Sequence, residues 1–145
     1  MFTQTGEYAL RAATFIGKQP GDKLVSAKEI AANTKVSLKY LQKVLRDLVQ
    51  ADVLSSTRGI GGGFRLSRLA DQMPLTDIVR PFDTSLRRIE CPFGNLYCGQ
   101  ETPCPVHNRW INVVTAYKNF LENTTVADVI ATGVHLPQAV TFSPR

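Results

Sequence analysis

The stretch SAKEIAANTKVSLKYLQKVLRDL, residues 26–48, decides the fold. Its first four residues are typical of a capping box, in which Ser26 caps a helix and Glu29 reaches back to the Ser26 amide. This signal predicts a short helix that runs through Ala32 and closes around Asn33.

A second, longer helix follows, with Ser37 as its candidate N-cap and its end near Gln50. Its expected apolar face consists of Leu38, Leu41, Val44, Leu45, Leu48 and Val49. Two helices joined by a tight turn are a helix-turn-helix, whose second member lies in the major groove of DNA. The expected DNA contacts from this helix are Ser37, Lys39, Tyr40, Gln42, Lys43 and Arg46. Lysine and arginine pair with guanine acceptors, and glutamine can bridge adenine.

The next stretch, DVLSSTRGIGGGFRLSR at 52–68, predicts a β-hairpin wing around a glycine-rich turn. We expect Arg58 at its base and Arg65 at its tip. The glycines, Gly62 among them, would leave backbone amides free to approach a phosphate or a narrow groove. Residues 1–83 are therefore predicted to form a winged helix-turn-helix DNA-binding domain, mainly α with a small β-hairpin.

The flanking segments predict further helices at 5–17, at 74–82 with a stop at Pro81, and at 124–130. A long helix is expected over 105–124. Its apolar residues recur at steps of three and four and include Trp110, Val113, Tyr117 and Phe120. Such a seam belongs either to an amphipathic helix on its own domain or to a dimerisation helix, and we favour dimerisation of 105–131. Residues 132–145 are predicted to form a tail without regular structure.

All three cysteines lie in CPFGNLYCGQETPCPVH, residues 91–107. We interpret 84–104 as a cluster-binding loop. The candidate metal ligands are Cys91, Cys98 and Cys104 in this loop and His107 at the start of the long helix. Thiolates suit iron–sulfur clusters, and imidazole can replace one of them. The alternatives are a Cys₃His zinc site, which would lack the usual CxxC pair, and unliganded or redox-active thiols.

Charge and composition limit the function. The chain is +5, and residues 35–68 hold seven basic residues against two acidic ones, which suits a phosphate-backbone binder or a solvated basic face. No apolar run long enough to span a membrane and no secretory signal are visible, so we expect a cytoplasmic protein with reduced thiols. No oxyanion loop or pocket-forming motif suggests an enzyme.

The chain resembles the bacterial winged-helix regulators of the IscR and NsrR type, which sense through iron–sulfur clusters. The matching motifs are YALRA at 8–12, SAKEIA at 26–31, SLKYLQKVLRDL at 37–48, RGIGGGFRL at 58–66, the cysteine loop, and TTVADVI at 124–130. The resemblance implies a homodimer on a near-palindromic operator, with DNA affinity responding to nitric oxide, iron or redox state. It offers two fourth ligands: a histidine in the place of His107, or a first-helix acid of the other subunit in the place of Glu7. We prefer His107 slightly, and with it a [2Fe–2S] over a [4Fe–4S] cluster.

Overall fold

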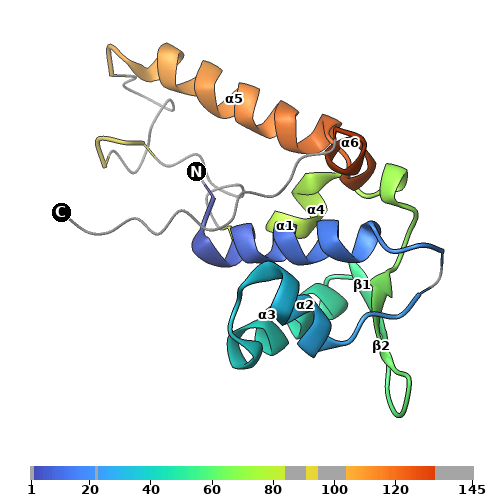
Figure 1. Cartoon of the computed structure of the whole chain (residues 1–145). Coiled ribbons are helices and arrows are strands. Elements are labelled where there is room, and N and C mark those ends of the chain that lie inside the picture. Colours follow the sequence, from blue (N-terminus) through green and yellow to red (C-terminus); the bar gives the residue numbers. More distant parts are fainter. Residues whose placement is uncertain (1, 22, 84–90, 95–103, 133–145) are drawn as a thin grey trace.

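The computed structural model describes residues 2–21, 23–83, 91–94 and 104–132, and its fold is mainly helical with one hairpin (Figure 1). In chain order the elements are α1 (Gln4–Gly17), α2 (Ala27–Thr34), α3 (Leu38–Gln50), β1 (Leu54–Thr57), β2 (Gly63–Leu66), the 3-10 helix η1 (Ala70–Gln72), α4 (Leu75–Val79), α5 (His107–Asn123) and α6 (Val126–Ala131). The predicted fold class is confirmed. Residues 133–145 of the tail expected at 132–145, and most of the cysteine loop, lie outside the described residues.

The core is built where α1, α2 and α3 pack together. Their buried apolar side chains are Ala9, Ala12, Ala13, Ile16, Ile30, Leu41, Val44, Leu45 and Leu48. Small alanines on the buried face of α1 let the helices approach closely. The Ser26 half of the predicted capping box forms, because its hydroxyl accepts a hydrogen bond from the Glu29 amide at 3.2 Å. The Glu29 carboxylate instead pairs with Lys23 Nζ at 3.3 Å.

The hairpin is antiparallel, with Leu54 opposite Leu66 and Thr57 opposite Gly63. Val25 pairs with β2 from outside the hairpin. Its amide donates to the Phe64 carbonyl at 2.9 Å, and its carbonyl accepts from the Phe64 amide at 2.8 Å. Gly63 must be glycine for this contact, because a Cβ there would lie 2.6 Å from the Val25 carbonyl oxygen. The wing is thus attached to the helical core at its base.

The C-terminal helix α6 packs against α1 and closes the domain. A Cβ at Gly17 would lie about 3 Å from the side chain of Val126 in α6. The backbone also pairs Pro74 with Thr125, through bonds of 2.9 Å on either side of the pair.

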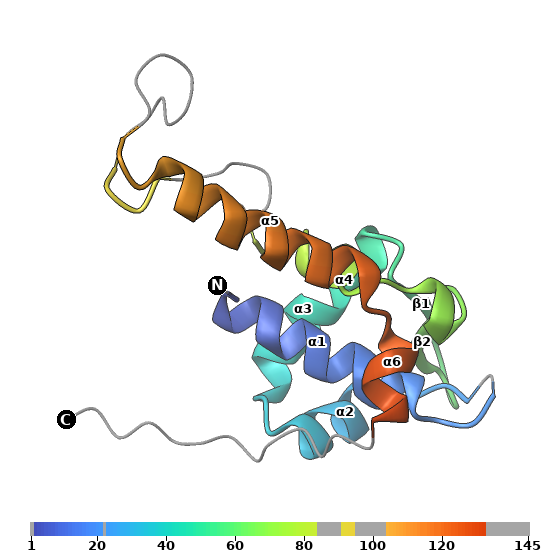
Figure 2. The same ribbon diagram turned by 90° about the horizontal axis from the view of Figure 1, so that it is seen from above.

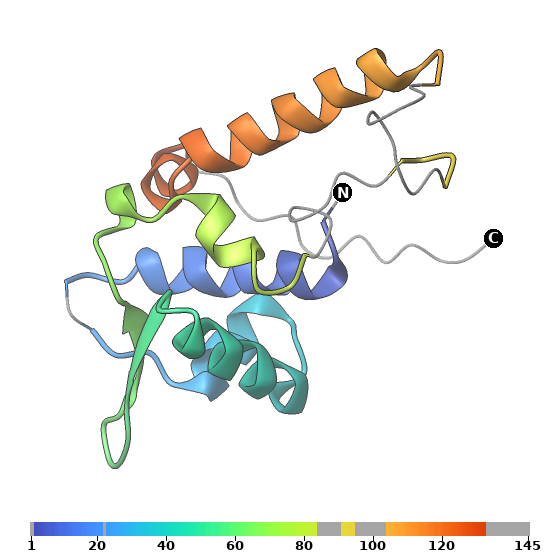
Figure 3. The ribbon, with the colours of Figure 1, turned by 180° about the vertical axis from the view of Figure 1, so that it is seen from behind.

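The C-terminal part of α5 contacts α4, and the N-terminal end of α5 extends beyond the domain (Figure 2). Seen from behind, α3 and the hairpin lie on the side of α1 opposite α5 (Figure 3). In the described part of the chain no helix is long and apolar enough to cross a membrane.

Candidate DNA interface and cysteine loop

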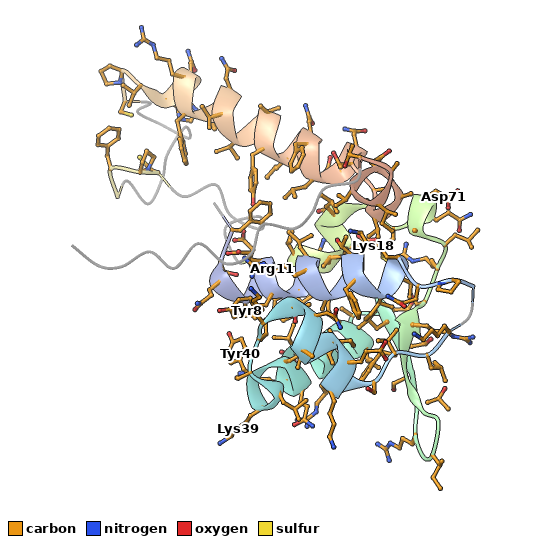
Figure 4. The ribbon with its side chains drawn as sticks, in the orientation of Figure 1. Tyr8, Arg11, Lys18, Lys39, Tyr40 and Asp71 are labelled. Carbon is orange, nitrogen blue, oxygen red and sulfur yellow. The ribbon has the colours of Figure 1, made fainter. Side chains whose placement is uncertain are left out.

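The outward face of α3 is the candidate DNA-reading surface. Its exposed side chains include Lys39, Gln42, Lys43 and Arg46, as the helical period predicts. Figure 4 shows Lys39 at the end of α3 farthest from α1. Ser37 occupies the N-cap position of α3, but its hydroxyl makes no capping hydrogen bond within the described chain. An exposed hydroxyl at a helix N-terminus suits a phosphate oxygen.

Tyr40 differs from the other predicted contacts because it packs onto α1. Its hydroxyl shares a hydrogen bond with Thr5, and its ring meets Tyr8 edge-on at 5.7 Å and 83° (Figure 4). The guanidinium of Arg11 lies 6.0 Å from the centre of the Tyr8 ring. Tyr40 is still 38% exposed, so it joins α1 to the DNA-reading helix. The sequence did not lead us to predict that Thr5, Tyr8 and Arg11 lie beside Tyr40, although their spacing places them on one face of a helix.

The two wing arginines lie in the reverse of the predicted order. Arg58 directly follows β1 and belongs to the turn, whereas Arg65 lies within β2 opposite Ser55. Arg65 Nε donates to the Ser55 hydroxyl at 3.2 Å. The register therefore places Arg58 at the tip and Arg65 nearer the base.

The expected role of Gly62 also needs correction. Its amide does not stay free for a phosphate, because it donates to the Gly59 carbonyl at 3.1 Å. A Cβ at Gly62 would lie 2.2 Å from the Thr57 carbonyl oxygen. Gly62 is glycine because the turn folds back on its own backbone.

The basic surface does not include every cation of residues 35–68. Arg68 forms an ion pair with Asp77 at 2.8 Å, and Arg80 lies 3.7 Å from the same carboxylate. Arg68 thus joins the wing segment to α4. The exposed basic side chains that remain in residues 35–68 come from Lys35 at the end of α2, from α3 and from the wing. Figure 3 shows α3 and the wing on the side of α1 opposite α5.

The described ends of the cysteine loop carry two half-buried cysteines, Cys91 and Cys104. Cys91 opens a turn in which Gly94, with φ of 75°, donates its amide to the Cys91 carbonyl at 2.9 Å. The His107 amide donates to the Cys104 carbonyl at 2.9 Å, so both residues lie in the turn that begins α5. Segment 91–94 lies near the same end of α5 in Figures 1 and 2. Cys98 lies outside the described residues. Thiolates and imidazole are ligand types that iron–sulfur clusters accept, but among the described residues no three such side chains lie close enough together to hold a metal ion.

Glu7, the other candidate fourth ligand, lies in the first turn of α1. Its side chain is 50% exposed and forms an ion pair with Arg11, whose own side chain is 14% exposed. Within one chain the carboxylate is therefore already held by a mostly buried cation.

The predicted seam of α5 is divided between two faces. Val113 and Phe120 are each 50% exposed, whereas Tyr117 turns toward its own domain and meets the Phe2 ring edge-on at 5.6 Å. Burial, and then the negative charge of Asp83, raise the pKa of Tyr117 to about 12. Leu121, which the seam omitted, is fully buried and is the apolar anchor of α5.

A recognition helix with an outward basic face and an arginine-bearing wing define a winged-helix DNA-binding regulator. The match to the Rrf2 family model, described as an iron-dependent transcriptional regulator, covers residues 2–132, and the chain belongs to this family. It is a DNA-binding transcriptional regulator and not an enzyme.

Relatives with known names are similar over most of the chain. An IscR regulator of Sodalis glossinidius is 29% identical, over 89% of this chain and 78% of its own length. An NsrR regulator of Halalkalibacterium halodurans is 26% identical, over 98% of both chains. The structure is also similar to that of CymR, the global cysteine regulator of B. subtilis, with a TM-score of 0.76, 25% identity, and coverage of 91% of this chain and 97% of that one.

Proposed function

We propose that the chain is a homodimeric, cytoplasmic regulator whose DNA affinity is controlled by an iron–sulfur cluster held in the cysteine loop. The observation that carries the proposal is the pair of half-buried cysteines, Cys91 and Cys104, with His107 one turn after Cys104. Half-buried thiols remain accessible to iron and sulfide, and neighbouring protein shields them in part from solvent. The similarity to IscR and NsrR regulators supports the same assignment.

In this proposal Cys91, Cys98 and Cys104 hold the cluster, which when bound supplies iron chemistry that responds to nitric oxide, iron supply or redox state. His107 is the preferred fourth ligand. Its backbone is already tied to Cys104, so it needs no movement of another element. Glu7 would first have to break its ion pair with Arg11. Breaking this pair would leave the largely buried Arg11 guanidinium without its carboxylate, which costs free energy. Histidine ligation favours a [2Fe–2S] cluster within one chain.

The dimer places two basic faces on one operator. Helix α5 would carry the interface through Val113 and Phe120, which are half-exposed within the single chain. A twofold dimer of winged helices fits a near-palindromic operator whose half-sites lie one or two helical turns apart. Lys39, Lys43 and Arg46 would read the major groove, and Arg58 would contact the groove beside it.

The test is spectroscopy on anaerobically purified protein, with iron and sulfide counted and DNA binding measured before and after cluster loss. Alanine variants of each of the three cysteines should lose the coloured species. His107→Ala should change the spectrum, while its exposed neighbour Asn108→Ala should leave it unchanged. A native spectrum in His107→Ala together with a lost one in Glu7→Gln would reverse the choice of ligand. If all three cysteine variants kept native spectra and regulated DNA binding, the assignment of the cysteine loop as the sensor would be refuted.

A second candidate is a cluster-free regulator that uses thiol redox chemistry or zinc. The half-buried cysteines of the loop and the similarity to CymR favour it. Iron and sulfide counts near zero, with DNA affinity that changes between a thiol reductant and a disulfide oxidant, would support thiol chemistry. Stoichiometric zinc without colour would support a zinc site.

A further inference from the structure

The tip of the wing carries an isoleucine whose side chain lies entirely in solvent. Ile60 has a relative exposure of 110%, against 67% for Leu69 and 73% for Phe93. Single exposed apolar residues are common and indicate nothing by themselves. The setting of Ile60 is what distinguishes it.

The turn that holds Ile60 is closed on both sides. Gly59 and Gly61 have φ of 99° and 74°, values that favour glycine, and the Gly62 amide donates to the Gly59 carbonyl at 3.1 Å. The pairing of Thr57 with Gly63 closes the strands just below the turn. A bulky apolar side chain is thus presented at the end of a short, hydrogen-bonded hairpin.

The charge around Ile60 suits a polyanion better than an apolar protein surface. Arg58 lies two residues before it and is exposed, Arg65 follows in β2, and residues 53–70 contain no acidic residue. A narrow minor groove attracts arginine through its enhanced negative potential. Proteins that bind this groove often insert an apolar side chain, isoleucine included, between two base steps.

We propose that Ile60 is an apolar wedge that enters the minor groove beside each half-site and partly unstacks one base step. This inference rests on the proposed docking of α3 and the wing on DNA. Unstacking bends the duplex, so the operator would be selected at that step by its deformability and not by hydrogen bonds. Flexible pyrimidine–purine steps should therefore be preferred where the wing lands.

The experiment uses the full-length protein and a duplex that the wild-type protein selects from a random-sequence library. The duplex carries 2-aminopurine at successive positions flanking the half-sites, and a dye pair at its ends reports bending. The variants are Ile60→Ala and Arg58→Ala, with Leu69→Ala as the control for loss of an exposed apolar side chain away from the turn.

Ile60→Ala should weaken binding about tenfold, because an isoleucine is no longer buried in the complex. It should also abolish the 2-aminopurine fluorescence rise and reduce the bend, with the salt dependence unchanged. Arg58→Ala should instead lower the salt slope by about 1, as expected for a lost phosphate contact. Leu69→Ala should behave as the wild type.

Wild-type affinity, stacking and bend in Ile60→Ala would overturn the wedge. A weaker complex with unchanged stacking and bend would overturn it too, since Ile60 would then only touch the duplex. If Ile60→Ala changes the sedimentation of the free protein, a second copy occupies the tip and the proposal fails. Normal DNA binding in both Arg58→Ala and Lys43→Ala would instead refute the docking itself, which separates the two failures.

Discussion

Replacing Phe120 with glutamate should separate the proposed dimer. An aromatic side chain buries roughly 150–250 Å² when covered, so the half-exposed ring of Phe120 leaves about 100 Å² for a partner. At about 25 cal/mol per Å², this area is worth about 2.5 kcal/mol per protomer and about 5 kcal/mol per twofold dimer. Phe120→Glu removes this term and places a carboxylate in the seam, so the dimer Kd should rise about a thousandfold or more.

Sedimentation velocity over a concentration series measures this shift, with circular dichroism as the check on folding. Asn119→Glu is the matched control, because it adds the same charge at the adjacent exposed position. Its dimer should persist, whereas Phe120→Glu should lose both the dimer and most of its operator affinity, since two half-sites no longer bind together. A folded Phe120→Glu protein that remains dimeric at wild-type concentrations would refute the assignment of the interface to this face of α5.

Three further changes test other parts of the structure. Because the pKa of Tyr117 is raised, the unfolded state loses this proton first as the pH rises from about 10 to about 12. The free energy of unfolding should therefore fall over this window less steeply in Tyr117→Phe than in the wild type. Parallel curves from alkaline urea titrations would contradict the burial of the Tyr117 hydroxyl near Asp83. Gly62→Ala should disrupt the wing and lower DNA affinity roughly 10- to 100-fold, as expected for lost groove contacts, with little change in Tm. Gly61→Ala, whose Cβ would meet open space, should cost only about 1–2 kcal/mol of local strain, and equal DNA affinities for the two variants would count against the wing geometry. Leu121→Ala should lower the free energy of unfolding by about 2–5 kcal/mol in chemical denaturation, and an unchanged midpoint would show that α5 is not anchored there.

The recognition helix could be predicted from sequence because its two faces differ so strongly in polarity. Leu41, Val44, Leu45 and Leu48 recur at helical spacing and are all buried. The side chains between them must then be exposed, whatever the rest of the chain does. The local pattern alone therefore predicts both that this helix forms and which of its faces is buried. Residue-level roles of the exposed face stay predictions, because they depend on the bound duplex.

The wing was predicted as a hairpin, but its arginines were placed in the wrong order. The apolar pairs Val53 and Leu54, and then Phe64 and Leu66, predict two short strands around the turn without stating which residues pair. The register is set by the turn and by Val25, which is distant in sequence from the hairpin and contacts Phe64. The glycines likewise reflect close backbone approaches, which composition cannot distinguish from exposed amides.

Helix α5 shows a different limit. A spacing of three and four predicts a single apolar stripe, yet Tyr117 and Leu121 face the chain's own domain while Phe120 faces away. Both stripes fit the same helix because successive residues lie about 100° apart. Only the packing of α5 on α4 shows which stripe is already covered.

The position of α1 connects these surfaces. Phe2, just before α1, meets Tyr117 of α5, and Tyr8 of α1 meets Tyr40 of α3. Glu7, which is paired with Arg11, lies between these two contacts in the sequence. In the dimer that we propose, a change at the start of α5 would reach the recognition helix in one of two ways: through these aromatic contacts, or through the spacing of the two subunits. The first route predicts altered DNA affinity within one subunit, and the second predicts altered half-site spacing alone. Binding to a single half-site, measured with and without the cluster, therefore separates them.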